Sequence, residues 1–258
     1  MGAWFPEAHQ YFIKKKIEDL LDFHHYYRPE ARVRMRPTFV RRAPALQRRL
    51  RFQLRGNIFS LARRMHSKEV LNLLRHEKAV QETVRKMHGE VFVDIGANIG
   101  FYSLILSKNF RRVVAVEPHP DNAREILRNA KEMRVRNIEV VQKAVSRSTG
   151  IAHLYQSSRD SGHTLNPRSH IASERALPVE TITLSELLKE YGQIDLVKVD
   201  VEGEEWGVLE GSLPIIDRIK AWVIELHRLN RKSELEKLLQ GKGYSFRWLD
   251  YNHSFAER

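Results

Sequence analysis

A strand that ends in aspartate and opens into a glycine-rich turn is the feature that most constrains the fold of this chain. Residues 91–95 read VFVDI, an apolar and largely β-branched run that is typical of a buried strand. The turn that follows, GANIG at 96–100, leads into a helical pattern at 99–108. Gly96 allows the tight turn, and Gly100 allows a helix or a ligand to approach the backbone closely. This strand–turn–helix order predicts an α/β fold.

Strands and helices continue to alternate after this unit. Strand patterns follow at 113–117, 138–142, 195–199 and 221–226, with a helix at 121–134 between the first two. This order predicts a mostly parallel sheet with helices on both faces, and it places ligands at the carboxyl ends of the strands. Apolar positions at helical spacing before it predict a mainly helical N-terminal region at 1–88, followed by an α/β domain at 89–258.

The spacing of the glycines and one acidic residue indicate which class of cofactor the turn can bind. The turn reads Gly-x-x-x-Gly, whereas the turn that cradles a pyrophosphate reads Gly-x-Gly-x-x-Gly. The second strand ends in Glu117, seventeen residues after Gly100, where a carboxylate can accept both hydroxyls of a ribose. A cofactor with a ribose but no pyrophosphate is indicated, and S-adenosylmethionine fits that description.

Two segments resemble a known enzyme family. Residues 91–118 resemble motifs I and II of class I methyltransferases, and DLVKVDVEGEEWGVLEG at 195–211 resembles the signature of the FkbM family. Residues 177–184 and 223–227 fit the same pattern, so the resemblance covers about residues 90–248. It implies a Rossmann-like, seven-stranded and mostly parallel sheet that binds S-adenosylmethionine at the tips of its first strands.

The resemblance also implies roles for individual residues. Glu117 is expected to hold the ribose, Pro118 to shape the next turn, and Ala144 and Val145 to flank the adenine. The residues expected along the methionine part are Asp94, Gly96, Ala97, Asn98 and Gly100.

Residues after the fourth and fifth predicted strands favour an oxygen acceptor. Nitrogen-directed enzymes typically carry an Asn/Asp-Pro-Pro-Tyr/Phe turn there, but residues 200–203 read DVEG, without proline or aromatic side chain. A hydroxyl loses a proton as it attacks a methyl group. A base that accepts this proton, or a cation that lowers the pKa of the hydroxyl, therefore helps the reaction. The catalytic candidates are Asp200, Lys198, Glu225 and His227.

Glu202 and His227 each have a simpler structural explanation. Glu202, next to the candidates, can simply place negative charge at the start of the following helix, and His227 can be a hydrogen-bonded loop residue. Together with Asp200 and Glu225 they offer oxygen and imidazole ligands for a divalent metal. We favour catalysis without a metal, because the same four residues suffice for acid–base chemistry.

Charge is distributed unevenly along the chain. Of the formal net charge of +12, residues 1–90 supply +11, from 20 Lys/Arg and 9 Asp/Glu. Eleven arginines fall between Arg32 and Arg64, and such a field attracts polyanions. We expect RNA or another polyanion to contact a group of these arginines: Arg48, Arg49, Arg51 and Arg55.

Three functions stay open on this evidence. The first is methylation of a hydroxyl on an anionic acceptor, with RNA slightly favoured because of the arginines. The second is O-methylation of a small molecule, sugar or lipid-linked glycan, and the third is cofactor binding without catalysis. The chain has no cysteine, no apolar run of about 18–20 residues that would span a bilayer, and no secretory signal pattern, so we expect a cytoplasmic protein.

Overall fold

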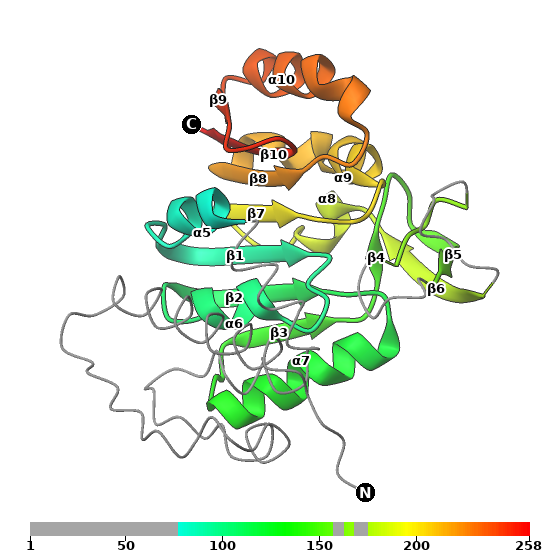
Figure 1. The fold of residues 1–258 in the computed structure, drawn as a ribbon. Helices are drawn as coiled ribbons and strands as arrows, with labels where there is room; N and C mark the ends of the chain where they lie inside the picture. Colours follow the sequence, from blue (N-terminus) through cyan, green and yellow to red (C-terminus); the bar gives the residue numbers. More distant parts are fainter. Residues whose placement is uncertain (1–76, 157–162, 168–174) are drawn as a thin grey trace, which may run out of the picture. The chain divides into compact units, whose positions relative to one another are not determined.

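The computed structural model describes residues 77–156, 163–167 and 175–258. The helical patterns predicted before residue 77, together with Arg48, Arg49, Arg51 and Arg55, lie outside these residues. Residues 77–258 belong to one compact unit built on a seven-stranded sheet (Figure 1). None of the described helices is long and apolar enough to cross a membrane.

The sheet has the strand order β3-β2-β1-β7-β8-β10-β9. Its first five strands run parallel and include every strand that the sequence predicts: β3 (Ile138–Val141), β2 (Phe110–Val116), β1 (Gly89–Ile95), β7 (Leu196–Val199) and β8 (Ala221–Glu225). β10 (His253–Glu257) is antiparallel to both of its neighbours, β8 and β9 (Ser245–Trp248). The predicted Rossmann-like, mostly parallel sheet of seven strands is confirmed.

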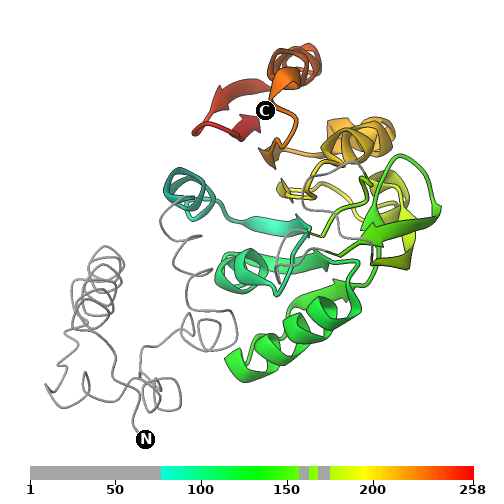
Figure 2. The ribbon, with the colours of Figure 1, turned by 45° about the vertical axis from the view of Figure 1, so that its right-hand side comes forward.

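Helices cover both faces of the sheet (Figure 2). Leu184 of α8 (Leu184–Leu187), Val208 of α9 (Glu205–Ser212) and Leu235 of α10 (Lys232–Gly241) are fully buried in one cluster with inward side chains of β1, β7 and β8. Ile126 of α7 (Pro120–Met133) packs on the other face against Ala115, and α6 (Phe101–Leu106) lies over β1 and β2 on the same side. Because most of β1, β2, β7 and β8 is buried on both faces, these strands read as nearly continuous apolar runs.

Some elements differ from the prediction. α6 begins at Phe101, because Gly100 has a left-handed φ of +88° and cannot be part of the helix. A separate three-stranded sheet of β4 (Ala144–Val145), β6 (Ala176–Ile182) and β5 (Gly150–Tyr155) was not predicted.

The short helix α5 (Lys78–Val84) falls inside a longer helical pattern that the sequence analysis assigned to the N-terminal region. In the structure it belongs to the same compact unit as the sheet. Two 3-10 helices, η2 (Leu213–Arg218) and η3 (Leu229–Arg231), complete the described elements. The division of the chain into domains at residue 88 stays a prediction.

Candidate active site

The glycine-rich turn after β1 is shaped by a contact with the turn after β7. Gly96 has a φ of +78°, and a Cβ atom added there would lie 1.7 Å from the backbone oxygen of Asp200. The amides of Gly96 and Ala97 both donate to the carbonyl of Val116, which ties the turn to the end of β2. Only glycine fits position 96, because both the left-handed conformation and the neighbouring carbonyl exclude a side chain.

Glu117 lies directly after β2, beside this turn. Its Oε2 accepts a hydrogen bond from the amide of Asn98 at 2.8 Å, and its Oε1 accepts one from the amide of His119 at 2.9 Å. Burial raises the pKa of Glu117 to about 7. Oε1 also accepts a longer hydrogen bond from the Asn122 side-chain amide at 3.5 Å. A carboxylate has about four lone-pair sites, so Oε2 can still accept a hydroxyl proton. Half-buried Pro118 joins Glu117 to His119, the residue that precedes α7.

Asp94 anchors the helix that follows the turn. Its Oδ2 accepts hydrogen bonds from the amide of Ser103 at 2.9 Å and from the Ser103 hydroxyl at 2.6 Å. Its Oδ1 is buried and has no hydrogen bond from any described residue. Burial raises the pKa of Asp94. The carboxylate therefore joins β1 to α6, and its expected place beside the methionine part of the cofactor stays a prediction.

Three of the apolar candidates are packed into the protein. The side chain of Ala97 contacts Ala115 and Ile126, whereas Ala144 lies in the core of the small sheet. Val145 belongs to the main core cluster. The predicted position of Ala144 and Val145 beside an adenine is not tested by this packing.

Lys198 and Asp200 form an ion pair where β7 ends. The Lys198 Nζ lies 3.1 Å from Asp200 Oδ2 and 4.9 Å from the centre of the Tyr102 ring. Burial disfavours the ammonium, but Asp200 and Asp94 keep the pKa of Lys198 above its ordinary value. Burial likewise disfavours the Asp200 carboxylate, but Lys198 and His227 hold its pKa below its ordinary range. Both groups are therefore charged at neutral pH.

His227 is held between Glu202, in the turn after β7, and Glu205, the first residue of α9. Its Nε2 lies 2.9 Å from Glu202 Oε2, and its Nδ1 lies 2.9 Å from Glu205 Oε1. Burial opposes a charged ring, but the two hydrogen bonds raise the pKa of His227 to about 11. His227 is thus a cation at neutral pH, with both ring nitrogens donating. Glu202 pairs with this histidine, a role more specific than placing charge at a helix start.

Glu225 lies apart from this group, in a second cluster of polar side chains. Its Oε1 accepts a hydrogen bond from the Asn252 side-chain amide at 2.8 Å, and its Oε2 lies 3.3 Å from His253 Nε2. Oε1 is 3.8 Å from His227 Nε2, so the two clusters adjoin. Burial opposes a charged His253 ring, but Glu225 raises its pKa to about 9.

The second cluster continues onto α5. Glu77, the residue before this helix, is buried and accepts a short hydrogen bond from the Tyr102 hydroxyl. Burial raises the pKa of Glu77 to about 7. The sequence analysis assigned no role to several side chains of the two clusters: Glu77, Tyr102, Glu205, Asp250, Asn252 and His253. Only Glu205 had a sequence signal, since it is the last glutamate of the Lys-x-Asp-x-Glu-Gly-x-Glu pattern at 198–205.

Two groups of side chains among the described residues have the composition of a metal site. One consists of Asp200, Glu202 and His227, and the other of Glu77, Glu225 and His253. Within each group the ligand atoms lie within 4.8 Å of one another. Of the four residues that the sequence analysis considered together as metal ligands, Glu225 thus belongs to the second group, although its Oε1 lies 3.8 Å from His227 Nε2 of the first.

Comparison with known proteins identifies the family. The model of the methyltransferase FkbM domain matches residues 94–246. This range includes the glycine-rich turn, Glu117 and most residues of the two polar clusters. Four residues of the second cluster lie outside it: Glu77, Asp250, Asn252 and His253. The chain belongs to the FkbM methyltransferase family. The resemblance found in the sequence is confirmed.

Two characterised relatives and one solved structure are similar to the chain. The hexuronic acid methyltransferase AglP of Haloferax volcanii is 27% identical over 183 residues, which cover 68% of this chain and 74% of the relative. The methyltransferase sdnD of Sordaria araneosa is 29% identical over 187 residues, 59% of this chain and 72% of the relative. A crystal structure of a methyltransferase FkbM from Methylobacillus flagellatus is 16% identical, with a TM-score of 0.48. The match covers 78% of this chain and 58% of the crystallised one.

Proposed function

We propose that this FkbM-family methyltransferase transfers the methyl group of S-adenosylmethionine to a hydroxyl oxygen of an acidic sugar. The observation that carries the proposal is the ionised carboxylate of Asp200, held between the cations of Lys198 and His227. This carboxylate is 24% exposed, whereas Lys198 is 3% exposed, so Asp200 is the member of the ion pair that an acceptor can reach.

The residues around the glycine-rich turn fit the cofactor. Glu117 accepts from two backbone amides and, at 3.5 Å, from the Asn122 side chain, which leaves its Oε2 able to accept from a ribose hydroxyl. It lies at the carboxyl end of β2, where ligands bind in sheets of this topology. When bound there, S-adenosylmethionine supplies an electrophilic methyl group. Residues of the chain position the acceptor and take up its proton.

Asp200 acts as the general base in this proposal. A hydroxyl acceptor donates a hydrogen bond to Asp200, and its proton passes to that carboxylate as the oxygen takes the methyl group. Lys198 fixes the carboxylate in position through its 3.1 Å contact. His227 is already protonated and both of its ring nitrogens have partners, so it adds positive charge near Asp200 and does not itself accept a proton.

The similarity to a hexuronic acid methyltransferase supports a sugar acid as the acceptor. A hexuronic acid offers two kinds of oxygen, namely hydroxyls and a carboxylate. A carboxylate has already lost its proton at neutral pH and needs no base, whereas a hydroxyl does. A site with an ionised aspartate therefore fits a hydroxyl better.

RNA is the second candidate acceptor. The sequence analysis placed it first, on the charge of +11 in residues 1–90 and on the group Arg48, Arg49, Arg51 and Arg55. These residues lie outside the described part of the chain, so the structure adds no support. We place the sugar acid before RNA because of the similarity to a hexuronic acid methyltransferase.

One experiment separates the two acceptors. The purified protein is incubated with methyl-labelled S-adenosylmethionine and either a hexuronic-acid oligosaccharide or total RNA. We expect label in the oligosaccharide with the wild-type protein and at least about 10²-fold less with Asp200→Asn. Label in RNA alone would replace the sugar with the second candidate, and label in neither would refute both.

A further inference from the structure

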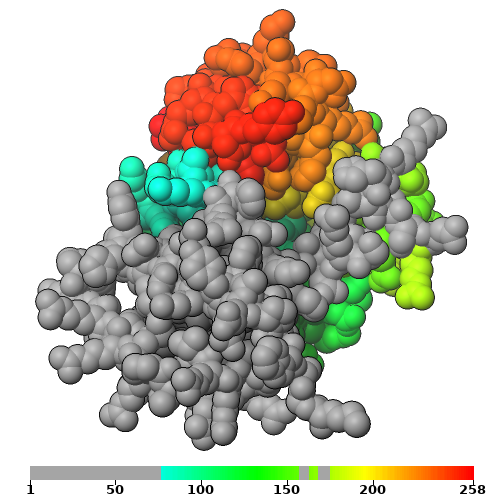
Figure 3. Space-filling view, viewed as in Figure 1, coloured from blue at the N-terminus to red at the C-terminus, as the bar shows by residue number. Residues whose placement is uncertain are grey.

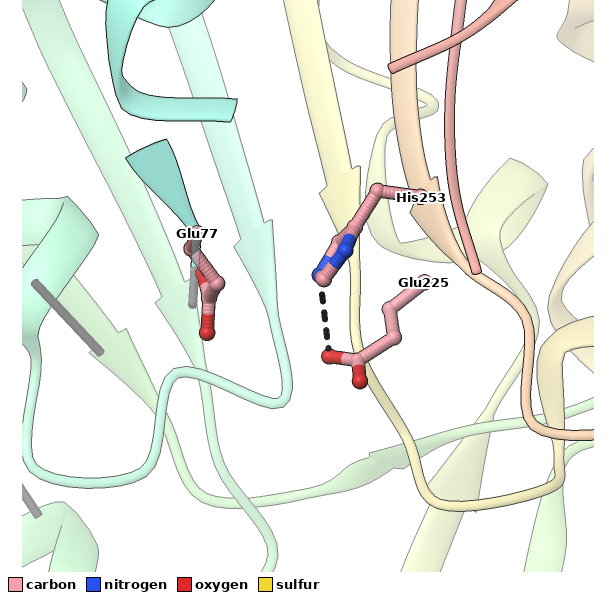
Figure 4. Close-up of side chains that lie close together, drawn as sticks. All are labelled: Glu77, Glu225 and His253. Carbon is pink, nitrogen blue, oxygen red and sulfur yellow. Dashed lines mark ion pairs between the residues drawn. The ribbon is translucent and has the colours of Figure 1, made fainter. Parts of the chain in front are cut away.

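Three elements far apart in the sequence bring Glu77, Glu225 and His253 together. Glu77 precedes α5, Glu225 ends β8 and His253 begins β10, where it lies opposite Glu225 in the antiparallel register. One ligand atom of each side chain lies within 4.8 Å of the others. Figure 4 shows Glu225 and His253 pointing toward each other, with Glu77 facing them across a short gap. In the space-filling view the cyan atoms of the α5 region meet the red C-terminal segment (Figure 3).

His253 is oriented as a metal-binding histidine. Its Nδ1 lies 2.9 Å and 3.0 Å from the two carboxylate oxygens of Asp250, and the side chain is only 5% exposed. One ring proton is donated from Nδ1 to Asp250, so loss of the other proton leaves a lone pair on Nε2. Nε2 is buried and forms an ion pair with Glu225, whose Oε2 lies 3.3 Å away (Figure 4). A divalent cation that binds Nε2 and the carboxylates takes the place of this proton, as metal binding to histidine requires.

The two carboxylates are held by outer hydrogen bonds in a comparable way. Asn252 donates to Oε1 of Glu225, and the Tyr102 hydroxyl donates to Oε2 of Glu77. Within the described part of the chain, neither carboxylate forms an ion pair with a lysine or arginine, because Lys198 pairs with Asp200. Outer partners that fix the ligands, such as the carboxylate behind a histidine, are the usual surroundings of a metal site.

We propose that Glu77, Glu225 and His253 bind a divalent ion of the first transition series. One imidazole and two carboxylates suit an ion such as Zn²⁺ or Co²⁺ better than Mg²⁺, which prefers oxygen ligands alone. The two negative charges balance the ion. Ligand atoms at about 2.1 Å from a tetrahedrally coordinated ion lie about 3.4 Å apart. The three ligand atoms now lie within 4.8 Å of one another, so the side chains have to close by about 1 Å on binding.

The adjoining group of Asp200, Glu202 and His227 is a poorer site for such an ion. The Nε2 of His227 lies 2.9 Å from Glu202, whereas the Nε2 of His253 lies 3.3 Å from Glu225, so the proton of His227 is held by the closer pair and is harder for an ion to replace. The proposed ion joins α5 and the start of β10 to the end of β8, beside the active-site residues. It is not required for the proposed proton transfer to Asp200.

The test uses the full-length protein, freed of metal with a chelator and titrated with Co²⁺. Visible absorption reports the ligand field of the ion, and Zn²⁺ is then added to displace it. We expect one saturable site in the wild-type protein. His253→Gln and Glu77→Gln should each weaken Co²⁺ binding more than about 100-fold, and Asp250→Asn, which removes an outer partner, about 10–100-fold.

His227→Gln is the comparison variant: it removes the histidine of the adjoining cluster, whose Nε2 lies 3.8 Å from Glu225 Oε1, and it should change Co²⁺ affinity much less than His253→Gln does. Near-ultraviolet circular dichroism checks that each variant is folded. If His253→Gln does not fold, Glu77→Gln and Asp250→Asn decide the outcome. No saturable site in the folded wild-type protein would overturn the proposal. Binding lost in His227→Gln but kept in the cluster variants would also overturn it, by assigning the ion to the other group.

Discussion

Gly96 is the position where a single added methyl group should do most damage. Its Cβ would lie 1.7 Å from the carbonyl oxygen of Asp200, a backbone atom that cannot rotate away. Its φ of +78° is also unfavourable for any residue with a side chain. Gly96→Ala therefore combines conformational strain with a clash between the turns that follow β1 and β7.

The magnitude can be divided into two parts. The left-handed conformation costs an alanine about 1–2 kcal/mol. Pushing the turn of residue 96 away from Asp200 adds about 1–3 kcal/mol, the usual cost of forcing an extra carbon into a packed region. The free energy of unfolding should therefore fall by about 2–5 kcal/mol.

Gly243→Ala provides a matched control for the strain. Gly243 has a φ of +84°, and no heavy atom lies within 4 Å of its added Cβ. This variant should lose only the conformational part, about 1–2 kcal/mol, and should keep its affinity for S-adenosylmethionine. Gly96→Ala should weaken that affinity as well, because the displaced turn carries Asn98, whose amide holds Glu117.

Urea unfolding and calorimetric titration with S-adenosylmethionine measure the two effects. The difference in unfolding free energy between the two alanine variants gives the cost of the clash alone. Equal destabilisation by Gly96→Ala and Gly243→Ala would refute the close approach between the turns. Unchanged cofactor affinity in Gly96→Ala would separate this turn from the cofactor site.

Three further predictions concern ionisable groups. Because the pKa of Glu117 is about 7 and ribose hydroxyls favour its ionised form, cofactor affinity should fall as the pH drops below 7, and Glu117→Gln should abolish this dependence in calorimetry. Asp200→Asn should lower kcat by at least about 10²-fold with little change in cofactor affinity; a parallel loss of affinity would make Asp200 a cofactor ligand. The pKa of His227 is raised from 6.5 to about 11, so its stabilising contribution is complete below pH 6.5 and lost as the pH rises toward 11. Urea unfolding should therefore show His227→Gln converging on the wild-type protein between these limits, and a constant difference would contradict the charged ring.

The parallel half of the fold follows from the sequence because its signals are local. Each buried strand is a short apolar run, and the turn at 96–100 fixes where the first one ends. The small sheet of β4, β5 and β6 has no such signal, since β4 has two residues and β5 fully buries only Leu154. A strand held mainly by pairing with a distant partner leaves little trace in hydrophobic periodicity.

The same distinction applies to the site. Lys198 lies on β7 and Asp200 directly follows the strand, two residues on, so extended geometry brings both side chains to the same face, and the 3.1 Å contact confirms it. Glu225 was grouped with His227 because they are neighbours in sequence, but its main contacts are Asn252 and His253 of the last strand. The antiparallel register of β10 on β8 determines that contact, and no spacing in the chain reveals it.

Two histidines near one sheet edge thus acquire different chemistry from their partners. His227 donates from both nitrogens to Glu202 and Glu205, which makes it a constant cation beside Asp200. His253 donates through Nδ1 to Asp250, and its Nε2 faces Glu225. Asp200 already pairs with the ammonium of Lys198. The base of the proposed reaction therefore depends on Lys198 and His227, and the second cluster can bind its ion without competing for it.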